Sequence, residues 1–132
     1  MLIPAIGFQG NCNDVIAFYQ EILGAQVKSI SHYKDAPADS EKPSTPPDFV
    51  VGSEVIIDGQ SVMMFDDDES RPVNGYFYFS LTKDTVEEVT TIFNKLVEGG
   101  KIITPLAPVY WSSLFGIVED KFGIAWMVMA SN

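Results

Sequence analysis

Hydrophobic positions along the first half of the chain predict one strand, one helix and three further strands. Val15, Tyr19 and Ile22 recur at the spacing of one helical face, and a glycine follows the last turn as a stop signal. We expect Asn11 or Asn13 to cap this helix by accepting a hydrogen bond from its first turn. The predicted strands of this half cover residues 3–8, 25–34, 50–57 and 61–65.

The second half of the chain repeats the same order of elements. Asp84 or Thr85 is expected to begin its helix, because Glu87 or Glu88 stands three residues further on, as in a capping box. Apolar positions at helical spacing follow, and a pair of glycines ends the helix. The predicted strands of this half cover residues 76–81, 101–104, 114–119 and 125–130.

The repeated order predicts an α+β fold of two βαβββ repeats, residues 1–70 and 74–132, within a single domain. Each repeat forms a curved mixed sheet with its helix on one face, and we expect the two sheets to enclose a shared groove. A groove of this kind is a common site for a small molecule. The Pro-rich polar stretch 35–48 is predicted to be a long surface loop.

Composition narrows the functions open to such a domain. The 132 residues include 18 acidic and 8 basic side chains, a formal net charge of -10, which argues against general binding to DNA, RNA or anionic membranes. The single Cys12 excludes an internal disulfide and a multi-cysteine zinc site. No apolar run approaches the roughly 20 residues that cross a bilayer. We therefore expect a soluble, cytoplasmic protein.

Several short motifs resemble those of a known family. They are Gly7-Phe8-x-Gly10-Asn11, Phe18-Tyr19-x-x-x-Leu23-Gly24, Tyr110-Trp111, Phe115-Gly116 and Asp120-Lys121-Phe122-Gly123-x-x-Trp126. Over nearly its whole length the chain resembles the PhnB-like branch of the vicinal oxygen chelate superfamily, which has the glyoxalase/bleomycin resistance/dioxygenase fold. Members of this branch often carry a demethylubiquinone methyltransferase label. The resemblance implies a homodimer.

The resemblance also bears on a metal site. Metal-dependent members of the superfamily hold a divalent ion with His and Glu side chains on the groove-facing strands. Carried over by motif spacing, these positions fall on Pro4, Met64, Tyr76 and Met127. None of the four offers a ligand that suits a catalytic divalent metal. The resemblance therefore implies that no metal and no cofactor is held here.

The same positions indicate which side chains face the groove. Residues two apart in a strand share a face, so each of the four positions brings its neighbours with it. Trp126 has the opposite parity and is expected to pack against a helix. Tyr110 and Trp111 are expected in an irregular segment, where aromatic residues contact a ligand, or else pack in a dimer interface or core. The predicted ligand-binding residues are Phe8, Met64, Asp66, Tyr76, Tyr78, Tyr110, Trp111 and Met127.

Three hypotheses for function follow. The first is a metal-free, PhnB-like protein that binds, and sequesters, an aromatic or cationic small molecule. The second is a glyoxalase-like lyase or isomerase, or a dioxygenase, with a non-standard site. It uses either an unrecognised set of metal ligands or metal-free acid–base catalysis by Tyr76, His32 or Asp66. The third is an interaction module whose groove is filled by its own side chains. Cys12 and His32 are expected to be structural, and no catalytic residue is identified.

Overall fold

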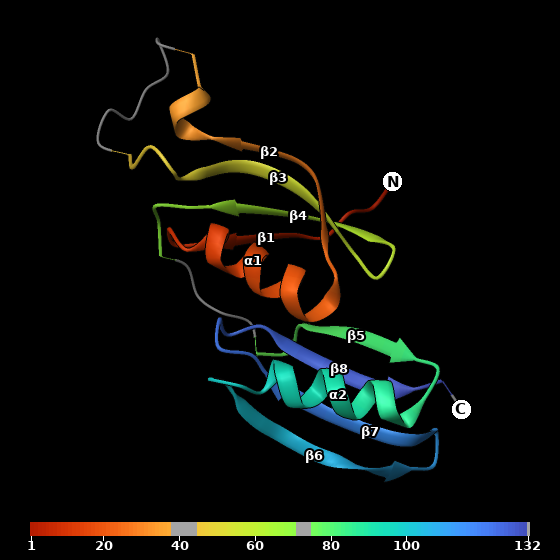
Figure 1. The fold of residues 1–132 in the computed structure, drawn as a ribbon. Coiled ribbons are helices and arrows are strands. Elements are labelled where there is room, and N and C mark those ends of the chain that lie inside the picture. Colours follow the sequence, from red (N-terminus) through yellow and green to blue (C-terminus); the bar gives the residue numbers. More distant parts are fainter. Residues whose placement is uncertain (38–44, 71–74, 132) are drawn as a thin grey trace. The chain divides into compact units, whose positions relative to one another are not determined.

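The computed structural model describes residues 1–37, 45–70 and 75–131 of the chain. It divides into two compact units, residues 1–72 and 73–132, and Figure 1 shows an α-helix beside a sheet in each. Each unit follows the order strand, helix and three strands, with a four-stranded mixed sheet in each. This confirms the predicted α+β fold of two βαβββ repeats.

The first unit consists of β1 (Ala5–Phe8), α1 (Cys12–Leu23), β2 (Gln26–His32), the short 3₁₀ helix η1 (Tyr33–Asp35), β3 (Val50–Ile57) and β4 (Gln60–Asp66). Its strands lie in the order β1-β4-β3-β2. The pairing of β1 with β4 is parallel and the other two pairings are antiparallel. The first and last strands of the repeat are therefore neighbours in the sheet.

The second unit consists of β5 (Tyr78–Lys83), α2 (Val86–Leu96), β6 (Lys101–Val109), β7 (Ser112–Glu119) and β8 (Ala125–Ala130). Its strand order is β5-β8-β7-β6, with β5 parallel to β8 and the remaining pairs antiparallel. The two repeats thus share one topology. Among the described residues, no helix is long and apolar enough to cross a membrane.

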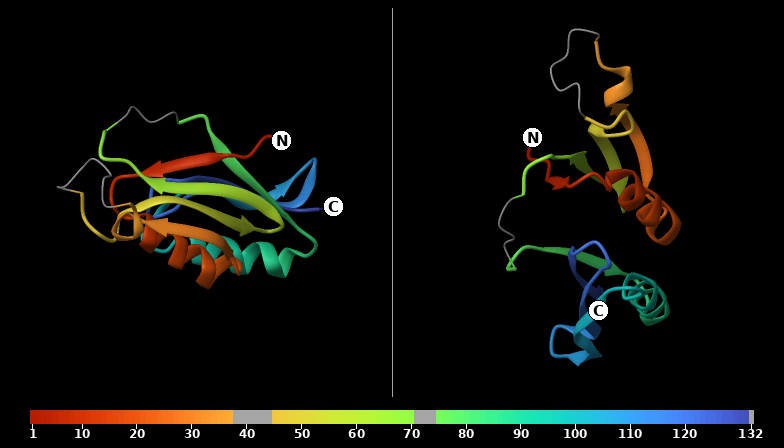
Figure 2. Two further views of the ribbon diagram at one scale, coloured as in Figure 1. Left: turned by 90° about the horizontal axis from the view of Figure 1, so that it is seen from above. Right: turned by 90° about the vertical axis from the view of Figure 1, so that its left-hand side faces the viewer.

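Each helix covers one face of its own sheet, as Figure 2 shows for both units. In the first unit Val15 and Tyr19 of α1 and Val55 of β3 are fully buried. Along β4 the buried Val62 alternates with Met63, which is 44% exposed. One face of each sheet is therefore the helix-covered core, and we call the opposite face the helix-free face.

The helix of the second unit packs on its sheet in the same way. Val89 and Phe93 of α2 are buried, as are Trp126 and Val128 of β8. The Trp126 ring also contacts the Phe79 ring, with centroids 5.0 Å apart. The prediction that Trp126 belongs to the core is therefore confirmed.

The two helices begin in different ways. At α2 the Thr85 hydroxyl accepts a hydrogen bond from the Glu88 N–H at 3.2 Å, so the predicted cap is confirmed. At α1 the side chain of Asn11 makes no such bond. Instead, the Asp66 carboxylate accepts the N–H of Cys12 at 3.0 Å. The prediction of an asparagine cap is wrong because a residue from a distant strand supplies the acceptor.

Strand β6 is longer than expected. The sequence predicted a strand over 101–104 and an irregular segment after it, because Pro105 and Pro108 lack the N–H of a ladder residue. The strand continues through both prolines to Val109. It can do so because it is an outer strand of the sheet and because its pairing with β7 shifts register around Thr104 and Ala107. Prolines are tolerated at edges and irregularities of this kind.

The ends of the predicted Pro-rich loop are tied to each other. The Tyr33 N–H donates to the Phe49 carbonyl at 2.8 Å, and the Lys34 N–H donates to the Pro47 carbonyl at 2.9 Å. These bonds bring the two sides of the loop together next to β2 and β3. Residues 38–44 of the predicted loop lie outside the described residues.

Candidate functional site

Three of the predicted ligand-binding residues lie in the first unit, and all three point into its core. Phe8 is 7% exposed and Met64 is 0% exposed. Phe8 pairs with Asp66 in the parallel β1–β4 register, so the two share the α1-covered face. The prediction that this face lines an open groove is wrong. A shift of one residue along β4 exchanges the two faces, and Met63 rather than Met64 lies on the helix-free side.

Asp66 has a structural role. Its Oδ1 atom accepts hydrogen bonds from the N–H groups of Gly10 and Cys12, both at 3.0 Å. Its Oδ2 atom accepts the N–H of Val50 at 2.9 Å. The carboxylate thus joins the end of β4 to the start of α1 and to β3, where its charge also favours the helix N-terminus. Both oxygen atoms are engaged within the protein.

Cys12 lies beneath this carboxylate and is fully buried. Burial, together with the nearby charge of Asp66, raises the pKa of the Cys12 thiol to about 12. A thiol with this pKa remains protonated at neutral pH, and the thiolate is the reactive form. Cys12 therefore does not provide a nucleophile under ordinary conditions.

His32 lies at the end of β2, as the sequence predicted, and is hydrogen bonded to α1. Its Nε2 atom lies 2.9 Å from the Oδ1 atom of Asn13, whose Nδ2 atom donates to the Asp48 carbonyl at 2.8 Å. Because Asn13 uses its amino group on Asp48, its oxygen is the acceptor and His32 Nε2 the donor. This chain of bonds fastens β2 and the segment before β3 to α1. It gives His32 a structural partner and not a catalytic one.

The helix-free face of the second sheet brings together two of the predicted residues, Tyr78 and Met127. Tyr78 pairs with Ala125 in the β5–β8 register, and Met127 pairs with Ile117 of β7, so all four side chains share this face. Tyr78, Ile117 and Met127 are each partly exposed. The face therefore presents apolar and sulfur-containing side chains, with the phenol of Tyr78 and the carboxylate of Glu119, which also pairs with Ala125, at one end.

Aromatic residues stand at the other end of this face. Tyr110 and Trp111 form the turn between β6 and β7 and are 97% and 49% exposed. The rings of Tyr110 and Trp111 have centroids 4.7 Å apart, and those of Trp111 and Phe115 are 5.2 Å apart. Phe115 pairs with Met129 on the helix-free face. The ring contacts thus connect the exposed turn to the sheet.

The distance between the two ends of this face suits a small molecule. Tyr78 pairs with Ala125, whereas Phe115 pairs with Met129 four residues further along β8. Four residues of strand span about 13 Å. Tyr76, another predicted ligand-binding residue, precedes β5 and is 90% exposed. Of the predicted set, the second unit therefore gathers Tyr78 and Met127 on the face itself, with Trp111 at its end.

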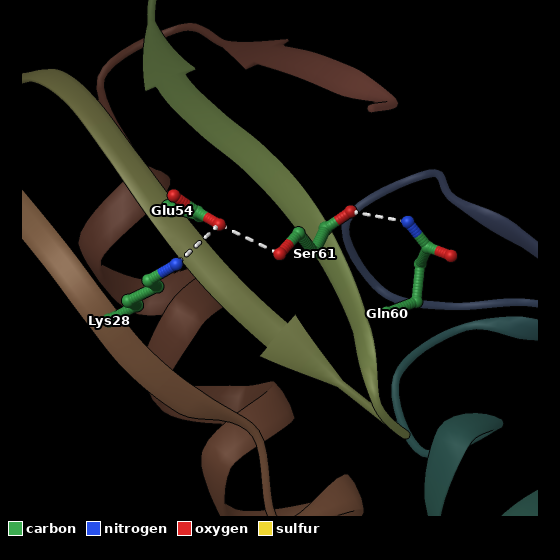
Figure 3. Close-up of polar contacts among 4 residues, drawn as sticks. All are labelled: Lys28, Glu54, Gln60 and Ser61. Carbon is green, nitrogen blue, oxygen red and sulfur yellow. Dashed lines mark hydrogen bonds and ion pairs between the residues drawn. The ribbon is translucent and has the colours of Figure 1, made fainter. Parts of the chain in front are cut away.

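The helix-free face of the first sheet carries a polar group that the sequence did not single out. The Glu54 carboxylate accepts a hydrogen bond from the Ser61 hydroxyl at 2.7 Å, and Lys28 Nζ lies 3.6 Å from the same carboxylate. Figure 3 shows Lys28, Glu54 and Ser61 in line across strands β2, β3 and β4. The Ser61 hydrogen bond, assisted by the charge of Lys28, lowers the pKa of Glu54 against the opposing effect of its partial burial. Glu54 is therefore ionised at neutral pH.

The sequence held one signal for this group. Glu54 is the one charged side chain of β3, and its cross-strand neighbour is Met63. In a strand that is buried on one face, a charged residue is expected on the other face unless buried donors satisfy it, as they do for Asp66. That argument identifies the helix-free side, but the strand pairing is needed to place Ser61 and Lys28 beside it.

A further hollow of about 300 Å³ lies in the first unit, near the ends of β1 and β4. It is lined by Gln9, Thr45, Pro46, Phe49, Asp67 and Asp68. Asp67 and Asp68 belong to the acidic stretch of residues 66–69. Asp68 and Glu69 are exposed, whereas Asp66 at the start of the stretch is buried.

The side chains of the described residues do not fit a divalent metal. Within residues 1–37, 45–70 and 75–131, no group of three or more His, Cys, Asp or Glu side chains could hold one. Of the positions carried over from metal-dependent relatives, Met64 is enclosed in the core and Met127 offers only a thioether. When the face of β4 is corrected, Met63 takes the place of Met64 at the predicted ligand position, and its thioether is equally unsuited to bind a divalent metal.

The fold and the helix-free faces together define a class of protein with two βαβββ repeats, each displaying one open sheet face. The model for the Glyoxalase/Bleomycin resistance protein/Dioxygenase superfamily matches residues 8–128. The chain belongs to this superfamily, and within it to the PhnB-like branch. The predicted family membership is therefore confirmed.

Three relatives illustrate the similarity. Protein YjdN of Escherichia coli is 33% identical over 137 residues, covering 96% of this chain and 92% of its own. A PhnB protein of Bacillus cereus, described as a putative 3-demethylubiquinone-9 3-methyltransferase, is 26% identical with a TM-score of 0.83, covering 98% of each chain. Protein PA1353 of Pseudomonas aeruginosa is 29% identical with a TM-score of 0.82, covering 99% of this chain and 97% of its own.

Proposed function

We propose that this PhnB-like protein binds an aromatic or cationic small molecule without a metal ion, on the helix-free face of its second sheet. The observation that carries the proposal is the partly exposed surface of Tyr78, Met127 and Met129, which ends at the exposed Trp111. Methionines adapt their shape to a ligand, and an aromatic residue offers a flat surface for stacking. The phenol of Tyr78 adds one group able to hydrogen bond with a ligand.

Sequestration is favoured over catalysis by the surroundings of the titratable groups. The carboxylate of Asp66 is engaged by backbone N–H groups, and His32 is bonded to Asn13. Neither lies on the helix-free face of the second sheet. An acid–base mechanism needs such a group within hydrogen-bond reach of the substrate. Tyr78 is the one predicted site residue with an ionisable group on this face, and the carboxylate of Glu119, which also lies there, is 3.4 Å from Lys101 Nζ.

The proposal includes a homodimer in the cytoplasm. The dimer is carried over from the family resemblance, and the location rests on the single cysteine and the acidic, disulfide-free sequence. Light scattering coupled to size-exclusion chromatography measures the mass in solution. A mass equal to one chain at all concentrations would remove the dimer from the proposal without affecting the ligand site.

Methionine methyl groups provide a direct test of the ligand site. The sequence holds five methionines, of which Met127 and Met129 lie on the proposed face and Met64 is fully buried under α1. Protein labelled with ¹³C at the methionine methyls is screened against aromatic metabolites and cationic antibiotics. We expect binders to shift the signals of Met127 and Met129 and to leave that of Met64 unchanged.

Variants then separate binding at this face from binding elsewhere. Replacing Met127 with Ala, or Trp111 with Ala, is expected to weaken binding of each hit about tenfold. Ile102→Ala, at a residue 52% exposed on the outer strand β6, serves as the matched control and should leave affinity unchanged. Hits that bind both site variants as tightly as the unmodified protein would refute this site. A stoichiometric transition metal in protein purified without chelator would refute its metal independence.

A further inference from the structure

The helix-free face of the first sheet carries one carboxylate that is fixed in place and kept charged. The Ser61 hydroxyl donates to the Glu54 carboxylate at 2.7 Å, a short hydrogen bond to a charged acceptor (Figure 3). Both residues lie on the rigid β3–β4 hairpin, so the carboxylate is oriented by the sheet and not by a mobile loop. The lowered pKa of Glu54 keeps it ionised through the neutral range.

The positive partner of this carboxylate is held much more loosely. Lys28 Nζ lies 3.6 Å from Glu54 Oε2, and the Lys28 side chain is 62% exposed. An exposed ion pair of this kind contributes little to stability, because water solvates both charges and the long lysine side chain loses conformational freedom. Another cation can therefore replace Lys28 at Glu54 with little loss to the folded state.

The surroundings of Glu54 suit a cation that is attached to an apolar body. Met63 is the direct cross-strand neighbour of Glu54 and is 44% exposed, so the two side chains lie about 5 Å apart. Phe65 shares this face two residues further along β4 and is partly exposed, and its ring lies over Gly7 of β1. On β3, a Cβ atom added to Gly52 would meet nothing within 4 Å, which leaves open space beside Glu54.

We propose that Glu54 binds the ammonium or amidinium group of a small organic cation, which takes the place of Lys28, while Met63 and Phe65 contact its apolar part. This site belongs to the first unit and goes beyond the proposed function, which is assigned to the helix-free face of the second sheet. The net charge of -10 supports the proposal, because a strongly negative protein attracts cations and repels anions over its whole surface. The subsite accordingly discriminates against carboxylates and phosphonates.

Three probes of one shape and different charge test the subsite. Benzylamine, which is cationic at pH 7, benzyl alcohol and benzoate are titrated separately into protein labelled at the methionine methyls. We expect benzylamine to shift the Met63 signal at the lowest concentration and benzoate to leave it unchanged. The adjacent Met64, 0% exposed, is the internal control. A Met63 shift with benzoate at the same concentration as with benzylamine would overturn the proposal.

Three variants test the exchange with Lys28. Glu54→Gln keeps the shape of the side chain and removes its charge, and should weaken benzylamine binding about tenfold. Lys28→Met removes the competing cation and should strengthen it severalfold. Glu119→Gln, at the Glu119–Lys101 pair of the second sheet, is the matched control and should leave the Met63 titration unchanged. Equal affinity in Lys28→Met and the unmodified protein would contradict the exchange.

The two sites are read out separately. Binding at the second sheet is followed at Met127 and Met129, and binding at Glu54 is followed at Met63. Failure of every aromatic probe to shift Met127 and Met129 would refute the proposed function while the Met63 titration still decides the subsite. If Glu54→Gln does not fold, the opposite and strengthening effect of Lys28→Met remains a test, since loss of structure cannot produce it.

Discussion

The Oδ1 atom of Asp66 accepts a hydrogen bond from the N–H of Cys12 at 3.0 Å, which joins the last residue of β4 to the first residue of α1. The same carboxylate also accepts N–H groups of Gly10 and Val50. A side chain that the sequence suggested for ligand binding thus organises the start of the helix, 54 residues away along the chain. Its replacement should therefore affect folding before it affects binding.

We expect Asp66→Ala to lower the free energy of unfolding by about 3 kcal/mol, because three backbone donors lose their acceptor in a buried position. Asp68→Ala, at an exposed residue of the same acidic stretch, is the control and should change it by less than about 0.5 kcal/mol. Urea denaturation followed by circular dichroism measures both. An Asp66→Ala protein as stable as the unmodified one would return Asp66 to the list of ligand-binding residues.

The raised pKa of Cys12 gives stability a specific pH dependence. The thiol has a pKa of about 12 in the folded protein against an ordinary value of 9.0, so above pH 9 the unfolded chain releases a proton that the folded protein keeps. The free energy of unfolding should therefore fall between pH 9 and 12, at up to about 1.4 kcal/mol per pH unit. Other titratable groups also change the free energy of unfolding between pH 9 and 12, so the unmodified protein is compared with Cys12→Ala.

The contribution of Cys12 is the difference between the two proteins. Urea denaturation of both at pH 8, 9 and 10 should show the unmodified protein losing stability relative to Cys12→Ala as the pH rises. Below pH 9 the difference should be constant, because the thiol is protonated in both states. Parallel curves up to pH 10 would mean that the thiol has an ordinary pKa. Rapid alkylation of the native protein at pH 8 would contradict its burial.

Asp120 holds the core of the second unit in a similar manner. Its Oδ2 atom accepts the Trp126 Nε1–H at 3.0 Å, and its Oδ1 atom accepts the N–H groups of Phe122 and Ile124. Because Asp120 and Trp126 are both 2% exposed, Asp120→Ala should destabilise the protein by about 3 kcal/mol and alter the fluorescence of Trp126. Trp111→Phe removes the other tryptophan, so that the spectrum reports Trp126 alone. An unchanged spectrum would place the indole in a different environment.

Two strand glycines form a matched pair for a packing experiment. A Cβ atom at Gly116 would lie 2.8 Å from the Phe93 ring and 2.9 Å from Leu106, whereas one at Gly52 would meet nothing within 4 Å. We expect Gly116→Ala to destabilise the protein by about 1–3 kcal/mol through overpacking between the sheet and α2. Gly52→Ala should be neutral or stabilising. Thermal denaturation of the two variants gives the comparison, and equal melting temperatures would contradict it.

The sequence predicted the elements better than it predicted the faces. Helical spacing and the Thr85–Glu88 cap located both helices, because these signals lie within one or two turns. In the second sheet the positions carried over from the family resemblance place Met127 on the helix-free face and Trp126 in the core, as the structure has them, whereas Tyr76 precedes β5. In β4 the neighbouring residues 63 and 64 are both methionines, so the sequence pattern does not show which of the two faces the core.

The remaining differences arise from interactions between distant residues. The acceptor for α1 comes from Asp66, and no local pattern reveals a bond between residues 54 positions apart. Glu54 stood out only as the one charged side chain of its strand, and its contacts with Lys28 and Ser61 depend on the pairing of three strands. The extension of β6 through Pro105 depended on its being an outer strand, which sequence alone does not show.

The parallel pairing of β1 with β4 has a consequence for the order in which the chain can fold. Ala5 of β1 is paired with Met63 of β4, so the strand that is synthesised first has no neighbour until the fourth strand is present. In the second repeat, Tyr78 of β5 likewise has no pairing partner until Ala125 of β8 is present. Contacts between such distant segments close large loops, and proteins rich in them fold slowly. In each repeat the local antiparallel strands can therefore pair early, whereas the first strand joins the sheet in a late step, and until then its apolar side chains have no partner strand.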